Sequence, residues 1–480
     1  MPIRLTGMAT GMDTETMIKQ MMQAHRMPID RMKQKQQTIT WQRDAYREMN
    51  TMMAQLRDTI STLRFESTTN AKKVTTGTTA VTATATSDTT PGAYALTIHQ
   101  MASAATITGN AVSSTTGPLN TAGDTVLTVN GVDITITQNS TANNVVTALN
   151  AKTSQTGVKA SFDAVTQRIT LTHNQTGSTS AINIAHKSGD ASLLTNMNLG
   201  TASATGQQAI VDYNGVSGLT FDTNSFKIEG INFTLKPTAG ATYPINVNVA
   251  VSADTDKVFD TIKSFVSKYN ELIDKVQKKT SEARYRDFQP LTDDQRKEMK
   301  EDEIKQWEEK AKSGMLRNDA TLKSAVDKMR TALMEPVTGL PAGSFDMLSD
   351  IGISTSKPGT QLAYKDNGKL YLDENKLREA LETNPEQVSD LLTKGYADRL
   401  YKEIDTTITR LTKLAGSGTT LADNSNLSLQ LRDLDRNISV KTSGLKAYED
   451  KYYKQFASLE TAIQTMNSQS AWLSQQFSSM

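Results

Sequence analysis

The sequence of 480 residues contains no cysteine, which excludes disulfides, thiolate catalysis and cysteine-ligated zinc sites. Aromatic residues make up only 6% of the chain and hydrophobic residues 37%, low values that we expect of elongated domains with thin cores. No apolar run reaches the ~18 residues of a membrane-spanning helix. The first residues also lack the apolar core of a secretory signal. We therefore expect a protein that is either cytoplasmic or exported without a cleaved signal.

Charge of one sign is not in excess either. The chain has 52 basic and 51 acidic residues, a net charge of +1, so nothing favours a nucleic-acid or anionic membrane partner. The four histidines stand far apart, and no phosphate-binding glycine loop or GxSxG motif is present. Adjacent acidic pairs occur only in charge-dense segments, where adjacency does not provide the convergent geometry of acid–base catalysis. We predict no catalytic site, cofactor or metal, and a protein that is not an enzyme.

Two seven-residue repeats near opposite ends of the chain are its most informative positive feature. The N-terminal series is Ile18, His25, Met32, Ile39, Tyr46, Met53 and Ile60. The C-terminal series is Leu431, Ile438, Leu445, Tyr452, Leu459, Met466, Leu473 and Met480. Such spacing, with a second apolar position three or four residues on, predicts helices that pack against partner helices. Apart from His25 and Met480, we assign these residues to a coiled-coil seam.

The N-terminal series has weak points. Asp13 or Thr14 can cap its helix, and Pro28 is expected to break or restart it. Lys35 and Gln42 occupy partner positions where apolar residues would be expected. His25 is either a packed seam histidine or a pH-responsive contact, and both interpretations remain open here. We predict that this helix is the moving or docking part of the pair.

The C-terminal series is more regular. Gly416 and Gly418 interrupt a helical stripe, and from Leu427 to the end the pattern is helical over about 50 residues, or ~75 Å. We therefore predict that this helix is the scaffold of the pair.

The middle of the chain has a different character. Residues 101–250 hold only 13 of the 103 charged residues, and their alternating pattern is typical of β-structure. Asn130-Gly131 and Asn214-Gly215 each predict a tight hairpin turn. A short helix is expected over Ala142–Lys152, and a longer one over Asp256–Lys278 with one apolar face.

These patterns predict an α+β multidomain protein with paired terminal coiled-coil helices, a mixed helical and β domain, and inserted β-rich head modules. The expected boundaries are an N-terminal helical arm at 1–66 that pairs with a C-terminal coiled-coil arm at 400–480. A mixed helical domain is expected from 67–100 together with 251–399. The β-rich head modules are expected at 101–250.

Several motifs resemble one known family. The opening resembles the N-terminus of the bacterial flagellar filament-capping family (FliD, among the hook-associated proteins), on Gly7, Met8, Ala9, Thr10, Gly11, Met12, Asp13 and Thr14, with Ile18 and Pro28 following. Asn130-Gly131, 148–150 and 157–161 are similar to a module shared by flagellins and hook-associated proteins. The C-terminal half resembles the cap family at 269–272, 351–353 and 368–374. The family N-terminal motif comprises Gly7, Gly11, Met12, Asp13 and Thr14.

The resemblance implies a secreted structural protein, exported by the flagellar type III system and seated as a homo-oligomeric ring at the distal tip of the filament. There it would promote polymerisation of exported flagellin and prevent its leakage. The implied partners are the chain itself, flagellin, the hook–filament junction proteins and an export chaperone. Some relatives also have an adhesive role. The alternatives are a hook–filament junction protein, which shares the terminal helices, and a surface adhesin with glycan-binding β-modules.

Overall fold

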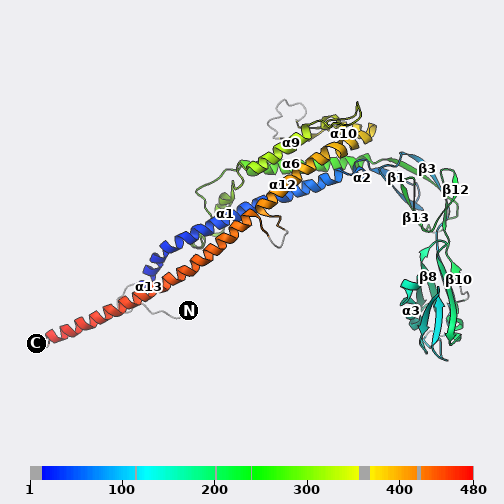
Figure 1. Cartoon of the computed structure of the whole chain (residues 1–480), viewed down its shortest axis with the longest axis horizontal. Helices are drawn as coiled ribbons and strands as arrows, with labels where there is room; N and C mark the ends of the chain where they lie inside the picture. The colour runs from blue at the N-terminus through cyan, green and yellow to red at the C-terminus, as the bar shows by residue number, and fades with distance from the viewer. Residues whose placement is uncertain are drawn as a thin grey trace. The chain divides into compact units, whose positions relative to one another are not determined.

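The computed structural model describes residues 13–113, 116–199, 203–238, 240–355, 368–418 and 423–478. It divides into two compact units, one formed by Met1–Thr69 with Phe259–Met480 and the other by Asn70–Val258. The first unit is mainly helical and the second mainly β (Figure 1). The chain is therefore an α+β multidomain protein with a long helix towards each end, as its periodicities predict.

The helical unit is built on long helices that lie side by side (Figure 1). Its described elements are α1 (Thr14–Leu63), α2 (Glu66–Thr69), α6 (Thr255–Ser281, whose first turn lies in the second unit), α7 (Asp293–Glu298), α8 (Glu301–Lys312), α9 (Ala320–Met334), the 3-10 helix η1 (Leu348–Ile351), β16 (Ile353–Ser354), β17 (Tyr371–Leu372), α10 (Glu374–Thr383), α11 (Pro385–Leu391), the π-helix η3 (Leu392–Tyr396), α12 (Ala397–Ala415) and α13 (Asn426–Ser478). The apolar stripe of α6 explains its place in the core, since Ile262, Phe265 and Tyr269 are buried.

Helix α1 packs antiparallel to two successive helices. Its C-terminal half lies along α12, where Asn50 bonds Thr412, Arg57 bonds Asp405 and Arg64 bonds Asp398. Its N-terminal half lies along α13, where the partners are Gln36 with Asp435 and His25 with Tyr452. Rising numbers on α1 meet falling numbers on α12 and α13. The two ends of the sequence therefore form one antiparallel helical arm.

The second unit contains two groups of sheets. A five-stranded sheet has the order β1 (Lys72–Thr75), β15 (Ile245–Ala253), β3 (Gly92–Gln100), β11 (Ala209–Tyr213) and β12 (Val216–Phe221). A three-stranded sheet has the order β13 (Ser225–Ile228), β14 (Ile231–Leu235) and β2 (Val81–Ala85). Both sheets share one core, in which Leu96, Val249 and Phe233 are buried, because alternate residues of each strand face inward.

A second core lies between the other two sheets of this unit. One has the order β10 (Ser203–Thr205), β9 (Ala181–Gly189), β5 (Thr125–Val129) and β6 (Val132–Ile136), and the other β4 (Ala104–Ala111), β8 (Arg168–Thr176) and β7 (Val158–Asp163). Helix α3 (Ala142–Asn150) adds Val145 and Leu149 to this core, and α4 (Thr153–Thr156) and α5 (Ser192–Met197) complete the module.

Both predicted Asn-Gly turns are confirmed. Asn130 and Gly131 join β5 to β6 with φ of 48° and 81°, and Asn214 and Gly215 join β11 to β12 with φ of 47° and 83°. Positive φ at both central positions is the requirement of a type I′ turn. Asn130 is also tied into the module, since its amide group bonds the carbonyl oxygens of Thr156 and Ala181.

One local expectation is wrong. Pro28 does not end the first helix, because α1 continues through it. An interior proline costs a helix about 3 kcal/mol, but packing on both sides offsets this here, since His25 stacks on Tyr448 and Ile29 is buried. The stretch 226–235 forms a hairpin. It turns at Glu229 and Gly230, both with positive φ, to form β13 and β14.

The division into units also differs from the expected boundaries within residues 67–100. Strands β1 and β3 both pair with β15, and β2 pairs with β14. Residues from Asn70 onward therefore form one unit with the β-rich segment, and this unit extends to Val258. The alternating pattern of 67–100 predicts the strands but carries no information on which distant strands they pair with.

Candidate functional site

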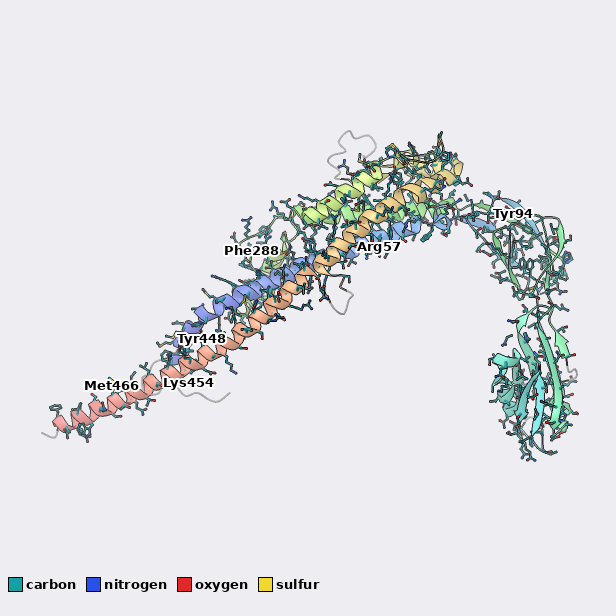
Figure 2. The ribbon with its side chains drawn as sticks, in the orientation of Figure 1. Arg57, Tyr94, Phe288, Tyr448, Lys454 and Met466 are labelled. Atoms are coloured by element: carbon teal, nitrogen blue, oxygen red, sulfur yellow. The ribbon has the colours of Figure 1, made fainter. Side chains whose placement is uncertain are left out.

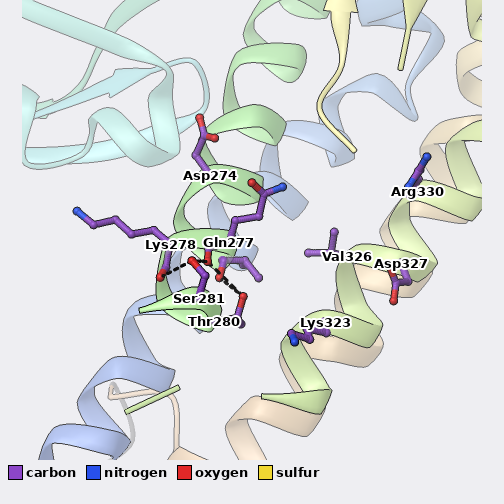
Figure 3. A pocket seen from close by; sticks show the side chains of 10 residues that line it. Asp274, Gln277, Lys278, Thr280, Ser281, Lys323, Val326, Asp327 and Arg330 are labelled. Carbon is purple, nitrogen blue, oxygen red and sulfur yellow. Dashed lines mark hydrogen bonds between the residues drawn. The ribbon is translucent and has the colours of Figure 1, made fainter. Parts of the chain in front are cut away.

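The groove between α6 and α9 does not have the arrangement of a catalytic centre. The groove in Figure 3 lies between α6 and α9, has a volume of about 560 Å³ and is open to solvent. The hydroxyls of Thr280 and Ser281 donate to backbone carbonyls of their own helix, and Asp274 pairs with Lys369 at 2.6 Å. These groups are engaged in the fold, and the groove combines no nucleophile with a base.

The described residues contain no group of three His, Cys, Asp or Glu side chains that could hold a metal ion. No helix within the described ranges is long and apolar enough to cross a membrane. The notable surface of the helical unit is instead the seam between its terminal helices.

The N-terminal part of the predicted seam lies largely inside the helical unit. Ile18, Ile39, Tyr46, Met53 and Ile60 are all buried, and Met32 is half-buried. Between them, Met49 and Leu56 on α1 are also buried, so α1 presents a continuous apolar stripe. Tyr46 adds a polar anchor, because its hydroxyl donates to Asp319 at 2.6 Å. Of the two weak positions, Lys35 is exposed and Gln42 is half-buried.

The C-terminal part of the predicted seam changes along α13. Leu431, Ile438, Leu445 and Tyr452 are half-buried. The later members are exposed, Leu459 by 47%, Met466 by 66% and Leu473 by 48%. Trp472 and Phe477 beside them are exposed by 59% and 76%. The end of α13 therefore carries large apolar side chains in solvent, which is unusual for a surface helix.

The exposure of the members after Leu459 follows from where α1 begins. His25 contacts Tyr452, and Thr14, the first residue of α1, lies 11 residues before His25. Antiparallel packing places Thr14 level with Ile463, 11 residues after Tyr452. Met466, labelled in Figure 2, lies further along α13, beyond the start of α1, and Leu473 follows it seven residues later. We call Leu459, Ile463, Met466, Leu473 and Phe477 the distal stripe.

His25 joins the two helices where the seam is half-buried. Its ring stacks on Tyr448 with centroids 4.5 Å apart and planes 13° apart, and its Nε2 lies 3.2 Å from the hydroxyl of Tyr452. The packed interpretation of this histidine therefore matches its surroundings.

A polar clasp fixes the turn between α12 and α13 onto α1. Arg47 donates from Nε to the carbonyl oxygen of Ala415 at 2.8 Å and from Nη2 to Asp423 at 2.5 Å. Asp423 also accepts from the amide of Ser425 at 2.9 Å and from the hydroxyl of Ser428. Gly416 is required beside it, because its φ is 79° and a Cβ there would lie 2.6 Å from a carboxylate oxygen of Asp423.

The clasp controls the ionisation of Asp423. Partial burial by itself would raise the pKa of this carboxyl group. The hydrogen bonds from Ser428 and Ser425, and then the charge of Arg47, outweigh burial and hold the pKa well below its usual value. A depressed folded-state pKa contributes stability above the unfolded pKa of about 3.9, and this stability is lost as the pH falls through the folded value.

We expect Asp423→Asn to lower the unfolding free energy by about 2 kcal/mol at pH 7, because charge-assisted hydrogen bonds are lost. The difference from the wild type should shrink below about pH 4, where the carboxylate of the unfolded wild type becomes protonated. Thermal unfolding from pH 3 to pH 8 measures the difference in stability between the variant and the wild type. Asp433→Asn, on the exposed face of α13, is the matched control and should change the unfolding free energy by less than about 0.5 kcal/mol. An equal loss at pH 3 and pH 7 would contradict the role of the ionised clasp.

The family N-terminal motif is partly visible. Asp13 is the N-cap of α1 and accepts from the amide of Thr16 at 3.0 Å, as expected of one of the two candidate caps. Thr14 is buried at the start of the helix. Gly7, Gly11 and Met12 lie outside the described residues.

Sequence reasoning missed the polar groups that set the register of the arm. Asn50, which is buried on α1, donates to Thr412 on α12 at 3.1 Å, and Asp423 completes the clasp. A buried polar residue in a helical seam is a known device for fixing register. Asn50 follows the apolar position Met49, which is the only sequence signal for it. Asp423 gives none, because it lies in a loop.

Comparison with known proteins places these features in one family. Three family models match the chain: "Flagellar hook-associated protein 2 C-terminus" over residues 206–468, "Flagellar hook-associated protein 2 N-terminus" over 10–105, and "Flagellin hook IN motif" over 119–175. The flagellar hook-associated protein 2 of Halalkalibacterium halodurans is 31% identical over 99% of this chain and all of that protein. The protein of the same name from Escherichia coli K12 is 26% identical over 98% of this chain and 97% of its own length.

The fold has a counterpart among solved structures. The crystal structure of the D1-D2-D3 domains of the flagellar cap protein FliD from Escherichia coli matches with a TM-score of 0.56 at 22% identity. The match covers 82% of this chain and 99% of that one. At this identity the likeness shows the fold alone.

Proposed function

Because this chain belongs to the flagellar hook-associated protein 2 family, whose members cap the flagellar filament, we propose that its terminal helical arm is the leg by which the cap engages the filament end. The protein is a structural cap at the distal tip of the bacterial flagellar filament, where it promotes polymerisation of exported flagellin and limits its leakage. It is exported and resides at the filament tip. Like its family, it works with flagellin and with further copies of itself.

The observation that carries the leg proposal is the distal stripe. Exposing large apolar side chains to water is unfavourable, at a cost of about 25 cal/mol per Å² of apolar surface. Met466, exposed by 66%, and Phe477, exposed by 76%, retain this cost in the isolated chain. The stripe also continues the seven-residue spacing that packs on α1. Docking of this stripe on apolar helices at the filament end removes the unfavourable exposure of these side chains to water.

We propose further partners from the export of this protein and from its position on the filament. The protein leaves the cell through the flagellar export apparatus, is held beforehand by an export chaperone and follows the hook–filament junction proteins. The family to which the chain belongs has a structural role, which supports a protein without enzymatic activity. The adhesin alternative has less support, because the matched family covers the terminal arm as well as the β-rich modules.

Deletion of the gene tests the function. We expect the deletion strain to keep intact hooks and to release unpolymerised flagellin into the medium, because nothing retains the subunits at the tip. Electron microscopy of the cells and immunoblots of the medium measure this. Addition of purified wild-type protein should restore filament growth. Failure of the purified protein to restore growth would favour the junction alternative. In that case the deletion would have removed the hook–filament junction to which a cap binds.

A further inference from the structure

The segment between α6 and α8 holds a rigid loop with two arginines that the leg does not use. Arg284, Tyr285 and Arg286 are all exposed, and Tyr285 is exposed by 46%. Neither guanidinium group has a carboxylate partner among the residues described. This is the only Arg-x-Arg sequence in the chain. Exposed Asp287 follows, so the tip has a net charge of +1.

The loop is held at both ends, so its arginines are presented by a fixed backbone. At one end the hydroxyl of Ser313 donates to the carbonyl oxygen of Ala283 at 2.6 Å, and a Cβ on Gly314 would lie 2.9 Å from Arg284 Cα. At the other end Trp307 Nε1 donates to the carbonyl oxygen of Gln289 at 2.7 Å.

Aromatic packing adds to these bonds. The ring of Phe288, labelled in Figure 2, lies 4.6 Å from that of Trp307, and Tyr285 meets Phe288 edge to face at 6.1 Å. A hollow of about 350 Å³ lies between the loop and Thr38 of α1. Two exposed arginines on a fixed backbone are suited to bind carboxylates, because a guanidinium group forms bidentate hydrogen bonds with a carboxylate.

The matching charge lies on the same chain. Glu301, Asp302 and Glu303 form the first turn of α8, and they are the only three consecutive acidic residues in the sequence. All three are exposed. Within one copy they are remote from Arg284, because Ser313 holds the loop backbone beside that residue and the ten residues from Glu303 to Ser313 span about 15 Å. Opposite charges thus stand at opposite ends of one rigid element.

We propose that the Arg284–Arg286 loop of one copy binds the acidic first turn of α8 of the next copy. Each copy then offers a basic end to one neighbour and an acidic end to the other. Such a head-to-tail contact closes into a ring when the rotation between copies permits it. This inference rests on the self-association stated under the proposed function and assigns residues to one of its contacts.

Charge reversal on the full-length purified chain tests the contact. The half-swapped variants are Arg284→Glu with Arg286→Glu, and Glu301→Arg with Asp302→Arg. We expect each to weaken self-association at least ~10-fold, because like charges then meet. The fully swapped chain, which carries all four substitutions, should regain association to within about threefold of wild type, since its charges are again complementary. Sedimentation velocity over a concentration series at low salt measures this.

Glu379→Arg with Glu382→Arg is the matched control, because these exposed acids lie on α10, away from both ends of the contact. It should associate like the wild type. Circular dichroism shows whether each variant is folded. Wild-type association in a half-swapped variant, or failure of a folded fully swapped chain to recover, overturns the inference while the capping function stands. A wild-type chain that stays monomeric at every concentration refutes the self-association on which both rest.

Discussion

Replacing Leu459, Met466 and Leu473 together with glutamine should leave the protein folded and abolish its capping of filaments. These side chains are at least 47% exposed, so they add little to the stability of the isolated chain. Glutamine keeps the helix intact because its helix propensity is close to that of leucine and methionine. If each side chain is an apolar anchor in the docked leg, the loss of three such anchors should reduce capping at least ~100-fold.

The measurement is filament growth in a strain that lacks the gene, with purified variants added at increasing concentration. The matched control replaces Lys454, Thr461 and Ser468 with glutamine. These exposed residues have the same seven-residue spacing on another face of α13. Thermal unfolding should be within about 1 °C of wild type for both variants, because exposed substitutions rarely exceed 0.5 kcal/mol.

Normal capping by the distal-stripe variant would contradict the leg proposal. Equal loss in both variants would show that any change on this helix impairs capping, and that the apolar face has no special role. Loss in the stripe variant alone assigns docking to the exposed apolar side chains.

The elements that sequence predicts well here are the ones whose signals are local. The Asn130-Gly131 turn depends on two residues that accept positive φ, and both strands follow from alternation on either side. The buried face of α6 follows from the spacing of Ile262, Phe265 and Tyr269. In these cases the physical cause lies within a few residues of the effect, so periodicity is sufficient.

Sequence cannot reveal where a partner helix ends, and this limits prediction of the candidate site. Tyr452 and Met466 occupy the same position in the repeat, yet one contacts α1 and the other lies in solvent. The difference is set by antiparallel register, which depends on pairs such as Asn50 with Thr412, hundreds of residues apart. Regularity along α13 therefore predicted it to be the scaffold, whereas the more deeply buried apolar residues belong to α1.

Pro28 illustrates the same limit in a single residue. Local chemistry predicts a break because proline removes one helical hydrogen bond. The contacts that keep α1 continuous, such as the stack of His25 on Tyr448, come from the far end of the chain. Tertiary packing thus overrides a local preference wherever both flanks of the proline are held.

Met53 and Met466, one from each repeat, offer a direct measure of this asymmetry. Met53 is fully buried and Met466 is 66% exposed, although both stand in the seam by sequence. Met53→Ala should cost about 2–5 kcal/mol of unfolding free energy, because it removes buried methylenes and leaves a cavity in the arm. Met466→Ala should change it by less than about 0.5 kcal/mol. Denaturant unfolding of the full-length chain, followed by helical circular dichroism, reports mainly on the helical unit.

Measuring the costs of Met466→Ala and Met53→Ala at several protein concentrations tests whether the distal stripe is free to dock. At low protein concentration the cost of Met466→Ala should stay near zero, because this side chain is 66% exposed in a single copy. A cost that approaches that of Met53→Ala at every concentration would mean that the stripe is packed within its own chain, and that it is not free to dock. A cost that appears only as concentration rises would instead show that copies of the chain bury the stripe against one another. The leg would then have to release that contact before it could engage the filament.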